Sequence, residues 1–220
     1  MNQDLIPKIT QNPLFLKLKG VVENGPYHNC EDVYSHALKT KDIALKEISA
    51  GFITNPEAKE RFIQFTNEEL YGFKRGEMMV LIALLHDIGK ILTVREGANT
   101  HPILVIDESG TTACPGHEHW GSTIVNKLLP ELPKEAAEYI ETVIRNHDTF
   151  NPLYFKSKEN LSPDMLMNNI KSRAEGLYIE ALFNIYCDCF TAIPFQNSKE
   201  MIIKIFNEPK LYERREYVLN

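Results

Sequence analysis

An uninterrupted apolar segment of eight residues, Met78 to Leu85, ends directly in His86 and Asp87 and leaves few architectures open to this chain. A helix that is apolar on every side has to be covered by neighbours all round, so the segment predicts the central helix of a bundle. It is too short to cross a bilayer, which takes about 20 apolar residues, and we expect no membrane-spanning helix. Gly89 marks a helix stop, which places His86 and Asp87 in the last turn, where unpaired carbonyls favour a bound cation.

Most of the remaining chain repeats apolar residues at intervals of three and four, which predicts further helices. The expected helices cover residues 31–49, 56–65, 76–88, 117–129, 134–147, 163–171, 174–192 and 197–207. Asn55-Pro56 is an N-cap followed by a first-turn proline, and it marks one of their starts. The exception is the β-rich run from Pro102 to Thr112, with turn residues at 107–110, which predicts a hairpin. We therefore expect an all-α fold, a helical bundle with one small inserted β-hairpin.

Composition and charge narrow the class of protein. The 220 residues are 43% hydrophobic and 25% charged, without an internal repeat, which is typical of a single globular domain. With 30 acidic and 24 basic residues, the formal net charge is −6, and this negative field disfavours non-specific binding to nucleic acid. No signal peptide is visible, and Cys30, Cys114, Cys187 and Cys189 lack the spacing of a zinc site, so we expect a reduced, cytoplasmic protein.

Several ionisable side chains fall on the apolar faces of the expected helices. Besides His86 and Asp87 they are His36, His117 beside an expected stripe of Trp120, Ile124 and Leu128, His147, and Asp188. Taken singly, each histidine is typical of a core residue bonded to a carbonyl, and a lone buried carboxylate costs several kcal/mol unless it is paired. Taken together, four histidines and two aspartates from five helices are satisfied at once by a bound metal. Imidazole with carboxylate suits Zn, Mn, Fe, Co or Ni, so we expect a metal centre in the core of the bundle.

Three short segments carry most of these side chains. They are Asp32–His36 (DVYSH), Leu84–Lys90 (LLHDIGK), and Gly116–Glu118 (GHE) followed by Gly121. In this order, and with His147 and Asp188 after them, they resemble the HD superfamily of metal-dependent phosphohydrolases over about residues 25–192. The resemblance implies an HD domain at 25–195 with an N-terminal extension at 1–24 and a helical tail of the same domain at 196–220. It is nearest to the HD domain of some bacterial tRNA nucleotidyltransferases, although the acidic signature of their nucleotide-adding head is absent.

The resemblance also implies a ligand set of one or two divalent transition metals. One metal would be held by His36, His86, Asp87 and Asp188, and a second by Asp87 with His117 and His147. Asp87 and a hydroxide would then be shared between the two metals. The implied activity is hydrolysis of a phosphomonoester or phosphodiester by the metal-bound hydroxide. The implied substrate is a small phosphorylated molecule, a nucleotide or a relative of one.

The roles of three neighbouring residues follow less directly. Lys90 would supply a positive charge to a phosphate oxygen, and the alternative is a solvated lysine that caps the carbonyls of the helix at 76–88. Glu118 is either a first-turn charge that complements the helix dipole or a proton shuttle. Asp148, next to His147, either supports a ligand residue or lies on the surface.

Two other functions fit the same residues. Some dinuclear-iron HD proteins cleave C–C or C–P bonds with dioxygen, and such an oxygenase needs redox-active iron and consumes O₂. A metal-stabilised module without activity would bind a nucleotide or a partner and release no product.

Overall fold

The computed structural model describes residues 5–22, 32–93, 105–106, 112–114, 116–147, 163–174, 176–190 and 196–213. Its helices are α1 (Leu5–Gln11), α2 (Pro13–Leu16), η1 (Lys17–Gly20), α3 (Val33–Glu47), α4 (Pro56–Asn67), α5 (Arg75–Leu85), η2 (Ile88–Thr93), α6 (His117–Leu128), α7 (Lys134–Asn146), α8 (Pro163–Arg173), α9 (Tyr178–Cys189), α10 (Gln196–Phe206) and η6 (Pro209–Tyr212). Two short antiparallel strand pairs join them, β1 (Glu69–Leu70) with β2 (Phe73–Lys74), and β3 (Val105–Ile106) with β4 (Thr112–Ala113). The expected all-α fold with a small inserted hairpin is confirmed, while the hairpin turn at 107–110 lies outside the described residues.

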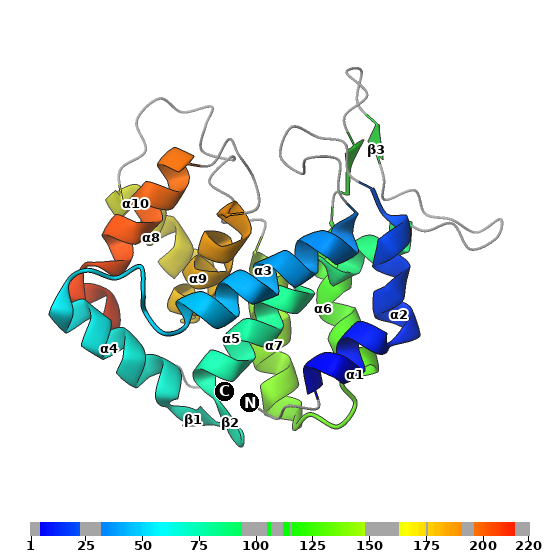
Figure 1. Ribbon diagram of the computed structural model, residues 1–220, viewed down its shortest axis with the longest axis horizontal. Helices are drawn as coiled ribbons and strands as arrows, with labels where there is room; N and C mark the ends of the chain where they lie inside the picture. The colour runs from blue at the N-terminus through cyan, green and yellow to red at the C-terminus, as the bar shows by residue number, and fades with distance from the viewer. Residues whose placement is uncertain are drawn as a thin grey trace.

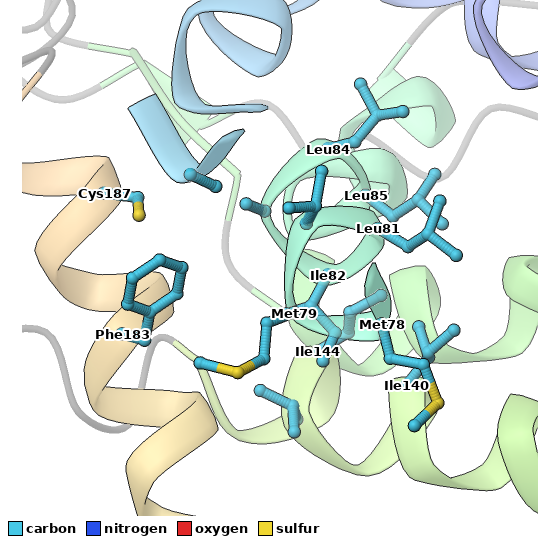
Figure 2. Close-up of a cluster of buried hydrophobic side chains, with 14 of the residues drawn as sticks. Met78, Met79, Leu81, Ile82, Leu84, Leu85, Ile140, Ile144, Phe183 and Cys187 are labelled. Atoms are coloured by element: carbon cyan, nitrogen blue, oxygen red, sulfur yellow. The ribbon is translucent and has the colours of Figure 1, made fainter. Parts of the chain in front are cut away.

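Helix α5 lies at the centre of the bundle, as its apolar sequence predicts. All residues from Met78 to Leu85 are at most 2% exposed, because α3, α4, α7 and α9 pack around them. Figure 1 shows α5 with α1, α2 and α6 on one side and α4, α8 and α10 on the other. In Figure 2 the side chains of α5 meet Ile140 of α7 and Phe183 of α9 in one continuous apolar layer.

Polar caps start two of the helices around this core. The Asn55 side chain accepts a hydrogen bond of 3.1 Å from the Ala58 nitrogen at the start of α4, and Pro56 occupies the first turn, as predicted. At the start of α3 the Asp32 carboxylate accepts a hydrogen bond of 2.9 Å from the Ser35 nitrogen. The second cap fixes the first turn of α3, which carries His36.

Two helix ends differ from the sequence-based expectation. Helix α5 ends at Leu85, three residues earlier than expected, and the chain continues after Asp87 as the 3₁₀-helix η2. The helix expected at 174–192 begins only at Tyr178, because Gly176 has a left-handed backbone with φ of 86° that a helix cannot contain. Both differences arise from backbone conformations that hydrophobic periodicity does not report.

The residues assigned to an N-terminal extension form α1, α2 and η1. Their apolar side chains Leu5, Ile9, Phe15 and Leu18 are buried in the same core as α5. The ring of Phe15 packs edge-on against Tyr34 of α3, with 5.5 Å between the ring centres. This segment therefore covers one side of the bundle. Among the described residues, no helix combines the length and the apolar character that crossing a membrane requires.

Candidate metal centre

Five helices bring the six predicted ligand residues to one place. His36 lies in the first turn of α3, His86 caps the end of α5 and is followed by Asp87, His117 begins α6, His147 caps the end of α7, and Asp188 lies in the last turn of α9. The carboxyl ends of α5, α7 and α9 thus meet the amino ends of α3 and α6. Unpaired carbonyls give a helix C-terminus a partial negative charge, so the three carboxyl ends favour a cation at this point.

The six side chains form two groups. In the first group the Nε2 atom of His36 lies 3.0 Å from Oδ1 of Asp188 and 3.4 Å from Nε2 of His86. In the second group the Nε2 atom of His117 lies 3.1 Å from Nε2 of His147 and 3.1 Å from Oδ1 of Asp87. Two ligands of one metal at about 2.1 Å lie about 3.4 Å apart in a tetrahedral site, so both groups have the spacing of a metal site.

The carboxylate of Asp87 faces both groups, one oxygen to each. Its Oδ2 lies 3.6 Å from Nε2 of His36 and 3.4 Å from Nε2 of His86. Its Oδ1 lies 3.1 Å from Nε2 of His117 and 3.7 Å from Nε2 of His147. This is the arrangement that a carboxylate needs in order to bridge two cations.

Three histidines are held by backbone carbonyls through their other ring nitrogen. The Nδ1 atoms of His86, His117 and His147 donate to the carbonyl oxygens of Ala83, Cys114 and Ile144, at 2.9, 2.7 and 2.7 Å. Because a carbonyl oxygen can only accept, each Nδ1 carries a proton, and a neutral ring in this tautomer keeps its lone pair on Nε2. In neutral rings, lone pairs of His117 and His147 that face each other at 3.1 Å repel unless a cation lies between them. Such carbonyl-bound histidines are typical metal ligands, so the residues present fit divalent transition metals.

Burial and nearby charge prepare these groups for binding near neutral pH. Burial disfavours the charged imidazole and lowers the pKa of His86 to about 4, which leaves this ring neutral. Burial opposes ionisation of Asp87, but the Lys90 charge together with the neighbouring histidines outweighs burial and holds the pKa of Asp87 well below its ordinary value. The same opposition holds at Asp188, where the hydrogen bond and charge of His36 lower the pKa of the carboxyl group. Neutral imidazole and ionised carboxylate are the forms that bind metals.

Asp188 is the only one of the six that has substantial contact with solvent. Its side chain is 34% exposed, whereas the other five are no more than 6% exposed. The sequence predicts Asp188 on the apolar face of its helix, and its carboxylate does face His36 and His86, but the last turn of α9 leaves one side of it uncovered. The centre is therefore approached from the Asp188 side.

Lys90 lies inside the protein, in contact with the centre. It is 4% exposed, and its Nζ atom lies 2.9 Å from Oδ2 of Asp87. The alternative of a solvated lysine that caps the central helix is wrong, because η2 turns the side chain inward. The ammonium group is therefore within reach of any anion that binds beside Asp87.

A close contact of η2 with α6 sets Asp87 against His117. A Cβ atom on Gly89 would overlap the carbonyl oxygen of His117 and would lie 2.5 Å from the nitrogen of Gly121. A Cβ atom on Gly121 would lie 3.1 Å from the nitrogen of Gly89 and 3.2 Å from the Ile144 side chain. The interpretation of Gly89 as a helix stop is wrong, since α5 has already ended at Leu85. Gly89 is required because the backbones of η2 and α6 touch.

The remaining predicted residues of this region take different places. Trp120 is 46% exposed, so the expected stripe through Trp120 is wrong, and the buried face of α6 runs from His117 through Gly121 instead. At 100° per residue Gly121 lies 40° from His117, on the side toward η2, and Trp120 lies 60° away on the other side. The Glu118 carboxylate is 3.6 Å from Nδ1 of His117. Asp148 lies outside the described residues.

Comparison with protein families agrees with this geometry. The HD domain profile matches residues 57–186, which is 130 of the 220 residues. His36 and Asp188 lie outside the match, and it is the structure that brings them beside His86. No curated protein matches the chain. With more than half of its length matched, the chain belongs to the HD domain family of metal-dependent phosphohydrolases.

Proposed function

We propose that this protein hydrolyses a phosphomonoester or phosphodiester of a small molecule, a nucleotide or a relative of one, with two divalent transition metals. The observation that carries the proposal is the position of Asp87. Each of its carboxylate oxygens faces its own group of imidazole nitrogens, at 3.1 to 3.7 Å. A structural site for one ion has no need of a carboxylate placed between two ligand groups.

In this proposal the two ligand groups hold one ion each. His36, His86 and Asp188 would hold the first, and His117 and His147 would hold the second, with Asp87 available to both. When bound, such ions lower the pKa of a water molecule to near 7 and neutralise charge on the phosphate oxygens. The carbonyl partners of the three Nδ1 atoms keep the rings in the tautomer that offers Nε2 to an ion.

The chain's own residues also define how a substrate approaches. The solvent-facing side of Asp188 is the one opening among the ligand residues, so a phosphate group reaches the centre past the end of α9. The other ligands and Lys90 are enclosed, and an enclosed site strengthens electrostatic contacts with a bound phosphate. In this proposal Asp87 and Lys90 are the catalytic residues, and Lys90 binds a phosphate oxygen.

Lys90→Met is expected to lower kcat/KM for a phosphoester about 100-fold, because it removes a buried positive charge from beside the reacting phosphate. Metal affinity is expected to stay equal or to increase, since the ammonium group now competes with metal for Oδ2 of Asp87. Steady-state kinetics and metal titration of the same preparation measure the two effects. Lys59→Met on α4, where the side chain is partly exposed, is the control and is expected to change neither. Equal kcat/KM in Lys90→Met and wild type contradicts the phosphate role.

The proposed reaction is tested by phosphate release from a panel of nucleotides, cyclic nucleotides and aryl phosphates. Protein stripped with a chelator is assayed with Mn²⁺, Co²⁺, Ni²⁺, Zn²⁺ or Fe²⁺ added back, in air and under nitrogen. We expect hydrolysis of at least one nucleotide that depends on added metal and proceeds equally without O₂. Consumption of O₂ with Fe²⁺ indicates an oxygenase instead. Stabilisation by a nucleotide without any product indicates a binding module.

A further inference from the structure

A second buried polar group lies away from the metal centre, at the opening turns of α5 and α9. We call it the Arg75 cluster, and its members are Glu68, Arg75, Tyr139 and Glu180. The guanidinium of Arg75 donates through Nη1 to Glu180 and through Nε and Nη2 to Glu68, at 3.2 and 3.0 Å for the latter pair. The hydroxyl of Tyr139 donates to the same Glu180 oxygen at 2.6 Å. Arg75, Tyr139 and Glu180 are all at most 6% exposed.

The cluster and the metal centre share the same three helices. Helix α5 carries Arg75 and is capped by His86, α7 carries Tyr139 and is capped by His147, and α9 carries Glu180 and Asp188. At 1.5 Å per residue, each pair is separated by about 12 to 17 Å along its helix. A slide of one helix against the others at the cluster end therefore moves a ligand at the other end by the same distance.

The apolar layer between the Arg75 cluster and the metal centre cannot by itself fix the positions of α5, α7 and α9 along their axes relative to one another. It is built from Met78, Met79 and Ile82 of α5 against Ile140 of α7 and Phe183 of α9 (Figure 2). Apolar contact is not directional, and methionine side chains in particular adapt to small displacements. Apolar cores lose uniqueness of packing before they lose stability, so such a layer tolerates small shifts of register.

The Arg75 cluster supplies the directional contacts that this apolar layer lacks. The planar guanidinium meets its two carboxylates only in one orientation, and Glu180 accepts from α5 and α7 at a single oxygen. Burying these charges costs free energy that an apolar replacement would avoid, and specificity of packing is one reason for a protein to keep them. A metal centre, in turn, needs its ligands within about 0.5 Å of their binding positions.

We propose that Arg75, Tyr139 and Glu180 are positioning residues for the metal centre, and that they set the register of α5, α7 and α9 that brings His86, His147 and Asp188 together. The inference rests on the metal-binding part of the proposed function and not on the reaction. It places a determinant of metal affinity a whole helix length away from the metal ligands.

Tyr139→Phe tests the proposal with the smallest change, since it removes one hydroxyl and keeps the ring in the core. We expect the dissociation constant for Co²⁺ to rise about tenfold, the lower end of what loss of a supporting contact costs a metal site. The visible absorption of bound Co²⁺ depends on coordination geometry and is expected to change as well. Both are measured by titrating the full-length, chelator-stripped protein with Co²⁺ alone.

Ile140→Val is the matched control on the same helix. It removes a methyl group from the apolar layer and lowers thermal stability without touching the cluster. We expect wild-type affinity and absorption for Co²⁺ in this variant. A purely structural role of the cluster predicts instead that Tyr139→Phe behaves like Ile140→Val at equal stability.

Arg75→Lys provides a second variant. A lysine keeps the positive charge, but its single ammonium group cannot donate to Glu68 and Glu180 at once in the planar geometry of a guanidinium. This variant is expected to weaken Co²⁺ binding in the same direction as Tyr139→Phe. The proposal is overturned if both variants, shown to be folded by circular dichroism, bind Co²⁺ with wild-type affinity and spectrum. The readout is independent of turnover, so a wild type that binds Co²⁺ and cleaves no phosphoester contradicts only the proposed reaction.

Discussion

Asp87→Asn is expected to remove both metals and to lower kcat/KM for a phosphoester at least about 1000-fold. The two oxygens of Asp87 face separate ligand groups, so neutralising this one side chain weakens both ion sites at once. Asparagine keeps the shape of the side chain but offers one oxygen without charge. The expected result is metal content near zero by elemental analysis, in protein that remains folded.

The control for this variant is Asp42→Asn on the surface of α3. The Asp42 side chain is 68% exposed and pairs with its neighbour Lys41, so its neutralisation changes the net charge by the same amount away from the centre. Metal content and activity are expected to match wild type. Full metal content in Asp87→Asn would rule out a shared carboxylate at the centre.

Among the glycines that the structure describes with their neighbours, Gly89 is the one where a change to alanine is expected to affect stability most. Its Cβ atom would overlap the His117 carbonyl oxygen, and backbone cannot move aside as a flexible side chain can. We expect the free energy of unfolding of the metal-free protein to fall by about 3 kcal/mol, the upper end for overpacking. Urea unfolding followed by circular dichroism measures the change. The shift also separates Asp87 from His117, so metal binding is expected to weaken in the folded fraction.

Gly20→Ala is a suitable control, because a Cβ atom on Gly20 meets nothing within 4 Å. Its effect on the free energy of unfolding is expected to stay within about 0.5 kcal/mol. If Gly89→Ala unfolds at the same urea concentration as Gly20→Ala, the close contact of η2 with α6 is refuted.

The helices and the meeting of six polar side chains could be predicted because both depend on local periodicity. The apolar segment from Met78 to Leu85 predicts a helix that is buried on all sides, and His147 continues the apolar stripe of its own helix. Once the apolar faces of the helices are known, packing into a bundle brings these faces together, and with them the polar side chains that they carry. No information about distant partners is needed for that step.

What the sequence could not predict depends on contacts between distant segments. Glu180 is one buried position among many on α9, and its partner Arg75 lies 105 residues earlier in the chain. The reason for Gly89 likewise lies in α6, and a glycine after a helical segment is equally compatible with a helix stop. The pattern of hydrophobicity predicts Trp120 on the buried face of α6, because a large apolar residue at the helical interval contributes more to the pattern than a glycine does. In the structure Trp120 is 46% exposed and Gly121 is the residue that packs against η2.

The partial exposure of Asp188 gives the two ligand groups unequal access to water. An ion beside Asp188 would exchange this carboxylate for water at the surface, whereas an ion among Asp87, His117 and His147 would be enclosed by ligands that are no more than 6% exposed. If the protein holds two ions as proposed, we expect the ion beside Asp188 to dissociate first during purification.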